Sequence, residues 1–158
     1  MSGEGVVAAS AAAGAQGRPF GYVIPEGKTA MVCEQDPVIQ EQIIGALKKM
    51  GFLTSQPASF RDALKQMRFH VFDIIFIGED FTNNVLVFLE NMNMRIRRKS
   101  FVALISSKIS TMDNMEAFHK SVNLIVNKRD IGEVEKILRQ AVAEHEDFYR
   151  TFKEKLPK

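Results

Sequence analysis

One short run, residues 73–80, constrains the fold of this chain more than any other. It reads Asp-Ile-Ile-Phe-Ile-Gly-Glu-Asp. Consecutive large apolar residues that are all β-branched or aromatic are typical of a strand that is buried on both faces. Such strands lie inside parallel sheets that are covered by helices, and ligands bind just beyond their carboxyl ends. Residues 78–80 are therefore the first place to look for a functional site.

The rest of the chain after Lys28 alternates between predicted strands and predicted helices. The capping residues Asp36, Ser59 and Asp113 mark helix starts, and Pro37 directly after Asp36 suits the first position of a helix. Alternation of this kind predicts parallel βαβ units with right-handed crossovers, and hence an α/β fold. The predicted strands span 29–33, 52–56, 73–77, 101–105 and 123–126, and the predicted helices span 37–50, 60–67, 84–92, 114–119 and 131–156.

The two ends of the chain have a different character. Residues 1–19 are almost all Ala, Gly, Ser and Val, and they cannot bury enough apolar surface to offset the entropy of ordering. We predict a disordered tail or linker there, and an extended segment with a turn over residues 20–27. Residues 28–144 are the predicted domain, and residues 145–158 are predicted to extend its last helix.

This predicted extension carries aromatic residues that have no obvious place in the core. Phe148, Phe152 and Leu156 recur at intervals of four residues, with Tyr149 beside them. Exposed aromatic residues in a row mark a contact surface. They either fold back onto the aromatic residues of segment 20–27 or form an interface with a second copy or a protein partner.

Composition excludes some classes of function. The net charge of +2 over 158 residues gives no general attraction to nucleic acid or to a membrane surface. Cys33 is the only cysteine, so an internal disulfide is impossible and a reducing compartment such as the cytoplasm is expected. No apolar run is long enough to cross a bilayer.

Several short motifs occur in a fixed order between residues 28 and 144, and together they resemble the receiver domains of bacterial two-component response regulators. The resemblance implies a flavodoxin-like, doubly wound, five-stranded parallel sheet with strand order 2-1-3-4-5. The motifs are Glu34-Gln35-Asp36-Pro37 after the first strand, residues 47–52 (Leu-Lys-Lys-Met-Gly-Phe), Ala63-Leu64, residues 73–78, Ser106 at the end of the fourth strand, and Lys128-Arg129 after the fifth.

The resemblance also implies a chemistry, which is phosphoryl transfer to an aspartate at the end of the third strand. Acidic residues hold Mg²⁺ beside that aspartate, and a hydroxyl and a lysine hold the phosphate. The matching positions in this chain are Glu34, Gln35, Gly78, Ser106, Ile125 and Lys128.

Three of these positions depart from the pattern of receiver domains. Gly78 stands where the acceptor should be and has no side chain to phosphorylate. Gln35 lacks the charge of the second metal-binding acid, and Ile125 replaces the aromatic switch residue. We therefore predict a degenerate receiver, or pseudo-receiver, that is not an enzyme. It would signal by protein–protein interaction through its fourth helix, fifth strand and last helix, the surface that the resemblance implies.

Two alternatives keep some chemistry at this site. Asp80 could act as a displaced acceptor, although it lies roughly 6–7 Å beyond residue 78 if the strand continues, while Glu79 would face the other way. Glu34 and Asp80 could also form a residual Mg²⁺ site, weakened by the missing charge at Gln35. The simpler interpretation is that Lys128 forms a salt bridge with Glu34, Glu79 or Asp80.

Ser106 and a group of basic residues before the fourth strand each have an ordinary structural interpretation. Ser106 can simply cap the loop that follows its strand. Arg95, Arg97, Arg98 and Lys99 form a basic loop that could contact nucleic acid. We favour an ordinary solvated loop because no aromatic stacking residues are interspersed with these charges.

Overall fold

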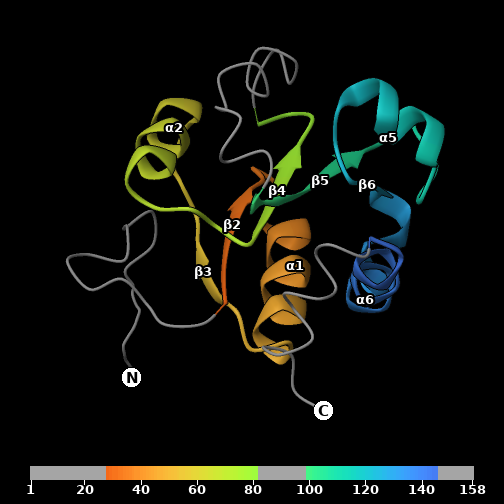
Figure 1. Ribbon diagram of the computed structural model, residues 1–158, viewed down its shortest axis with the longest axis horizontal. Helices are drawn as coiled ribbons and strands as arrows, with labels where there is room; N and C mark the ends of the chain where they lie inside the picture. Colours follow the sequence, from red (N-terminus) through yellow and green to blue (C-terminus); the bar gives the residue numbers. More distant parts are fainter. Residues whose placement is uncertain (1–27, 82–98, 146–158) are drawn as a thin grey trace.

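Five parallel strands form one sheet in the computed structural model, which describes residues 28–81 and 99–145 (Figure 1). The order across the sheet is β3-β2-β4-β5-β6, so the predicted order 2-1-3-4-5 is confirmed. Each predicted strand is present, and each end lies within one residue of its predicted position. The strands are β2 (Thr29–Cys33), β3 (Leu53–Ser55), β4 (Ile74–Gly78), β5 (Phe101–Ser106) and β6 (Leu124–Asn127).

Strand β4 lies in the middle of this sheet. Its first residue, Ile74, pairs with Ala30 of β2 on one side and with Phe101 of β5 on the other. All five residues of β4 are buried, as its apolar sequence predicts. The abrupt end of this strand at Gly78 therefore falls at the centre of the carboxyl edge of the sheet.

The helices α1, α2 and α5 begin where the capping residues predict. The Asp36 carboxylate accepts hydrogen bonds from the N–H groups of the first turn of α1, Ser59 caps α2 and Asp113 caps α5 in the same way. Each of these side chains satisfies backbone N–H groups that the helix itself leaves unpaired. The helices are α1 (Pro37–Lys49), α2 (Phe60–Phe69), α5 (Asn114–Lys120) and α6 (Val134–Glu144), with the 3-10 helix η1 (Lys128–Glu133) before α6.

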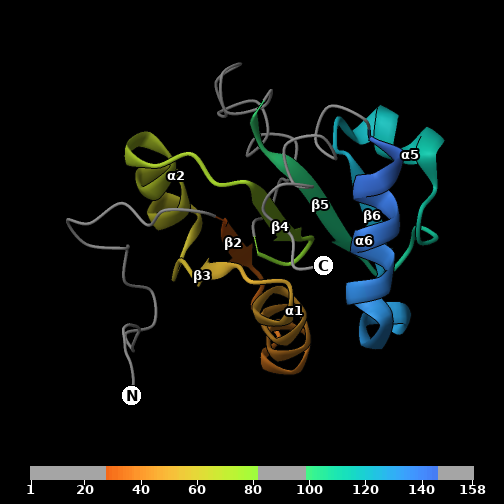
Figure 2. The same cartoon turned by 60° about the horizontal axis from the view of Figure 1, so that its bottom comes forward.

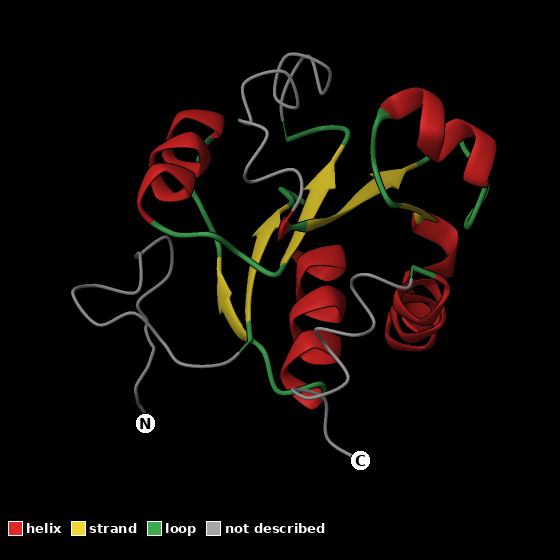
Figure 3. Ribbon diagram, viewed as in Figure 1, coloured by secondary structure: helices red, strands yellow, loops and turns green. Residues whose placement is uncertain are grey.

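Helices cover both faces of the sheet (Figures 2 and 3). On one face Leu47 of α1 and Leu138 of α6 pack against the sheet in a cluster that includes Phe76. On the other face Met67 of α2 and Ala117 of α5 pack in a second cluster with Ile75. Neighbouring residues of β4 thus belong to opposite clusters, as the two-residue repeat of a strand requires.

The last helix is shorter than predicted. Residue Ile131 lies in the 3-10 helix, and α6 begins only at Val134, after Gly132, a residue that weakens helices. It ends at Glu144, because His145 has extended backbone angles and its ring packs edge-on against Phe101 at 5.4 Å between centroids. The prediction of one continuous helix over 131–156 is therefore wrong.

Some predictions fall on residues that the structure does not describe. They concern the tail over 1–19, the segment over 20–27, the third helix, residues 146–158 with Phe148, Tyr149, Phe152 and Leu156, and the basic residues Arg95, Arg97 and Arg98. Of the basic loop only Lys99 is described, and it is exposed. Among the described helices, none is long and apolar enough to cross a membrane.

Candidate functional site

The carboxyl edge of the sheet brings together the predicted site residues. Glu34 follows β2, Gly78 ends β4, Ser106 ends β5 and Lys128 follows β6. The register holds these strand ends level, since Gly78 pairs with Ile105 and Ser106 with Asn127. Parallel strands that end side by side form the usual ligand-binding edge of an α/β sheet.

Gly78 and Glu34 share the space in which a side chain at position 78 would stand. A Cβ atom built on Gly78 would lie 2.2 Å from Glu34 Oε1 and 2.9 Å from Glu34 Cδ. Real Cβ atoms do not approach other heavy atoms so closely. The Glu34 carboxyl group therefore occupies the place of the missing side chain, and an aspartate at position 78 would require it to move.

The environment of Glu34 is unfavourable for a charge. The residue is only 3% exposed, and burial raises the pKa of its carboxyl group, partly offset by the hydrogen bond from Asp36 and by the charge of Lys128. Oε2 accepts a hydrogen bond of 3.0 Å from the Asp36 N–H. Oε1 has no hydrogen-bond partner among the described residues.

Glu79 begins a turn instead of continuing the strand. The Phe81 N–H donates to the Gly78 carbonyl at 3.1 Å, which closes the turn. The Glu79 carboxylate accepts from the Ser106 hydroxyl at 2.8 Å and from the Ser107 N–H at 3.1 Å. The strand alternation that assigned Glu79 to the other face therefore stops at Gly78, and sequence reasoning missed these contacts.

Ser106 caps its own loop, as the simpler interpretation predicted. The side chain is fully buried, and its hydroxyl oxygen accepts hydrogen bonds from the N–H groups of Lys108 at 3.0 Å and Ile109 at 3.1 Å. The same hydroxyl donates to Glu79. Each of these contacts lies within the chain itself.

Lys128 forms the expected salt bridge, with Asp80. Nζ lies 2.8 Å from Asp80 Oδ2, and the side chains are 27% and 67% exposed. The hydrogen bond to Asp80 is the main cause of the raised pKa of Lys128, and the charge of Glu34 adds to it. An ion pair this exposed contributes little to stability, on the order of 0–1 kcal/mol.

The other two matching positions take no part in a site. Gln35 is exposed, and Ile125 is fully buried in the cluster beneath α2 and α5. Asp36, the third acid of the motif, is engaged as the cap of α1. Gln35 therefore brings no negative charge to the site, and Ile125 has no polar group with which to contact a phosphate.

Comparison with known proteins is informative at the level of structure. No protein-family model and no curated sequence matches this chain. Among solved structures, the receiver domain of a Pseudomonas aeruginosa sensor histidine kinase, described with a magnesium ion in its active-site cleft, aligns with a TM-score of 0.59 and 16% identity. The alignment covers 74% of this chain and 98% of the receiver domain.

Two further solved structures give the same result. An orphan response regulator of H. pylori aligns with a TM-score of 0.58 and 18% identity, over 74% of this chain and 98% of its own. A chemotaxis response regulator of Vibrio cholerae aligns with a TM-score of 0.61 and 14% identity, over 73% and 98%. At these identities the likeness concerns the fold.

The residues at the carboxyl edge do not fit the Mg²⁺ that the first of these structures contains. Glu34 has a free inner oxygen, but Gly78 offers no ligand, Gln35 carries no charge and Asp80 is paired with Lys128. The described part of the chain holds no group of three or more His, Cys, Asp or Glu residues placed to bind a metal ion. The strand order, the covering helices and the aligned structures together show that this chain has the flavodoxin-like fold of response-regulator receiver domains.

Proposed function

We propose that this chain is a receiver-like signalling module that acts through protein–protein contact and is not phosphorylated at the position usual for receiver domains. The observation that carries the proposal is the Glu34 carboxyl group beside Gly78, 2.2 Å from where a Cβ atom would be. The chain thus lacks the acceptor group at position 78, and the Glu34 carboxyl group occupies the place where that group would stand. Phosphoryl transfer depends on a positioned acceptor and a metal ion, so its central requirement is missing.

The geometry also argues against Asp80 as a displaced acceptor. Its carboxylate is 67% exposed and bonded to Lys128 at 2.8 Å. It belongs to the turn after β4, and no described carboxylate cluster stands ready to hold a metal ion beside it. Phosphoryl transfer needs a metal ion beside the acceptor, and this is the requirement that the described residues around Asp80 do not meet.

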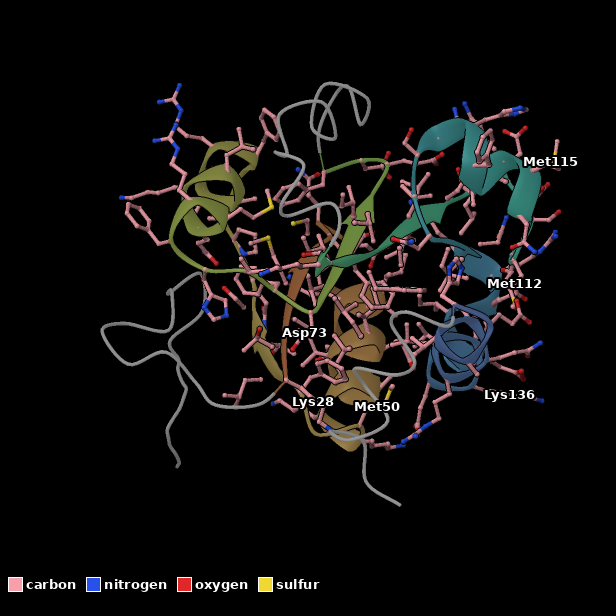
Figure 4. All side chains as sticks on the ribbon, in the orientation of Figure 1. Lys28, Met50, Asp73, Met112, Met115 and Lys136 are labelled. Carbon is pink, nitrogen blue, oxygen red and sulfur yellow. The ribbon has the colours of Figure 1, made fainter. Side chains whose placement is uncertain are left out.

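The surface of α5 supports the interaction role. Met115 is 67% exposed and Phe118 is 79% exposed, one turn apart on the same helix (Figure 4 labels Met115, which points outward). Large apolar side chains that remain exposed together are typical of contact sites between proteins. The partner would be another protein or a second copy of this chain.

The phosphorylation part of the proposal can be tested by intact-mass measurement after incubation with acetyl phosphate and Mg²⁺. We expect no stoichiometric gain of a phosphoryl group. A stoichiometric gain that is lost in Asp80→Asn would refute the proposal and establish the displaced acceptor.

The interaction part can be tested by comparing two exposed phenylalanines. Phe118→Ser removes the apolar group from α5, and Phe69→Ser is a matched control because Phe69 is 77% exposed on α2. Self-association in sedimentation equilibrium, or binding to an identified protein partner, should weaken by at least about tenfold in Phe118→Ser only. If both substitutions weaken association equally, or if neither does, the contact surface lies elsewhere on the protein.

A further inference from the structure

The loop from β5 to α5, residues 107–113, is held by hydrogen bonds from both neighbouring strand ends. On the β4 side the Glu79 carboxylate accepts from the Ser106 hydroxyl and from the Ser107 N–H, at 2.8 and 3.1 Å. The Ser106 oxygen in turn accepts from the N–H groups of Lys108 and Ile109. One carboxylate therefore fixes the first part of the loop, directly or through Ser106.

The β6 side holds the second part of the loop. The Asn127 amide nitrogen Nδ2 donates to the Ile109 carbonyl at 2.9 Å, and the Asn127 N–H donates to Thr111 Oγ1 at 2.8 Å. Thr111 Oγ1 donates to Asp130 at 2.5 Å. The Met112 N–H donates to the Ile125 carbonyl at 2.8 Å. The loop is thus anchored at both ends before α5 begins.

Met112 shows that the loop conformation is imposed on the chain. Its φ is +62°, in the left-handed region that residues with a Cβ atom rarely adopt. Such a conformation persists only where surrounding contacts hold it in place. Asp113, the next residue, is the cap of α5, so the position of the loop determines the position of the helix.

We propose that Glu79 is a built-in anionic clamp that holds the β5–α5 loop, and through it the exposed face of α5, in one arrangement without any bound ligand. The hydroxyl of Ser106 and the N–H of Ser107 are two converging donors, and the carboxylate of Glu79 offers one charged oxygen to each of them. Because the chain supplies this anion itself, the donors are already satisfied. The inference rests on the proposed function, since it concerns how the surface with Met115 and Phe118 is presented.

The clamp can be tested by amide hydrogen exchange of the full chain, followed by NMR. Glu79→Ala should accelerate exchange at Ser107, Lys108 and Ile109 by at least about tenfold and shift the methyl resonance of Met115. The control Glu41→Ala removes an exposed carboxylate from α1 and should leave these rates unchanged. Glu79→Gln preserves the size of the side chain but keeps only one acceptor oxygen, so it should produce a smaller acceleration.

A chemical rescue distinguishes a clamp from general support of the fold. In Glu79→Ala, sodium formate supplies a carboxylate to the same two donors and should slow exchange at Ser107 relative to sodium chloride of equal ionic strength. Unchanged exchange at Ser107 in Glu79→Ala, or equal acceleration in Glu41→Ala, would overturn the inference. Phosphorylation of the wild-type chain would refute the proposed function but would leave these exchange rates as a separate result.

Discussion

Replacing Gly78 with alanine should destabilise the protein, although a change from glycine to alanine often stabilises the folded state. The added Cβ atom would lie 2.2 Å from Glu34 Oε1. Ordinary contact requires about 3.5 Å, so the Glu34 carboxyl group has to move by roughly 1 Å or more. It is 3% exposed, so movement costs packing and strains its bond from the Asp36 N–H. Overpacking costs about 1–3 kcal/mol, and we expect the lower end of that range because the Glu34 carboxyl group is the end of a flexible side chain.

The measurement is the free energy of unfolding in urea, within a double-mutant cycle. Glu34→Ala removes the obstructing carboxyl group, so Gly78→Ala should cost much less in that background than in the wild type. The expected coupling between the two positions is at least about 1 kcal/mol. Gly45→Ala is the matched control, because a Cβ at Gly45 meets nothing within 4 Å, and it should gain about 0.5–1 kcal/mol.

Two outcomes would refute this reasoning. If Gly78→Ala is as stable as the wild type, Glu34 does not fill the space beside Gly78. If the two substitutions are additive, any loss at Gly78 has another cause.

Three further predictions concern charged side chains. The pKa of Glu34 is raised above 4.5 in the folded state, so the stabilisation from its bound proton is complete below pH 4.5 and disappears as pH rises through the folded pKa. Wild type should therefore gain stability relative to Glu34→Gln as pH falls from 7 towards 4.5 in urea titrations, and a constant difference would contradict this. Asp80→Ala should lower the free energy of unfolding by less than about 1 kcal/mol, because the salt bridge to Lys128 is exposed. In 1 M NaCl the difference from the wild type should disappear. A larger loss that does not depend on salt would contradict this. Lys28→Ala should lower the free energy of unfolding by about 1.5–3 kcal/mol, because the buried Nζ donates to the Met50 carbonyl at the end of α1 (Figure 4). A midpoint temperature of thermal unfolding equal to that of the wild type would contradict this prediction.

Much of the fold follows from local sequence signals. The apolar run of β4 and the caps Asp36, Ser59 and Asp113 each act over a few residues, and the structure places strands and helices where they indicate. The end of α6 does not follow from local signals, because the contact of His145 with Phe101 joins residues far apart in the chain. A helical pattern alone carries no information on such a contact.

The candidate site can likewise be predicted from the sequence only in part. The absence of an acceptor at Gly78 is visible in the sequence, and so is the possible pairing of Lys128. The position of the Glu34 carboxyl group depends on how β2 and β4 pair, and the clamp of Glu79 depends on where β4 stops. One sequence signal could have suggested the contact between Glu79 and Ser106: a glutamate directly follows the glycine that ends one strand, and a serine ends the neighbouring strand.

The most direct test of the proposal that phosphorylation does not switch this module is the ¹H–¹⁵N spectrum of α5 before and after addition of acetyl phosphate and Mg²⁺. We expect the amide resonances of Met115 and Phe118 to remain in place, because position 78 carries no acceptor side chain and the Glu34 carboxyl group lies in its place. Displacement of both resonances, together with the gain of one phosphoryl group per chain, would contradict that conclusion.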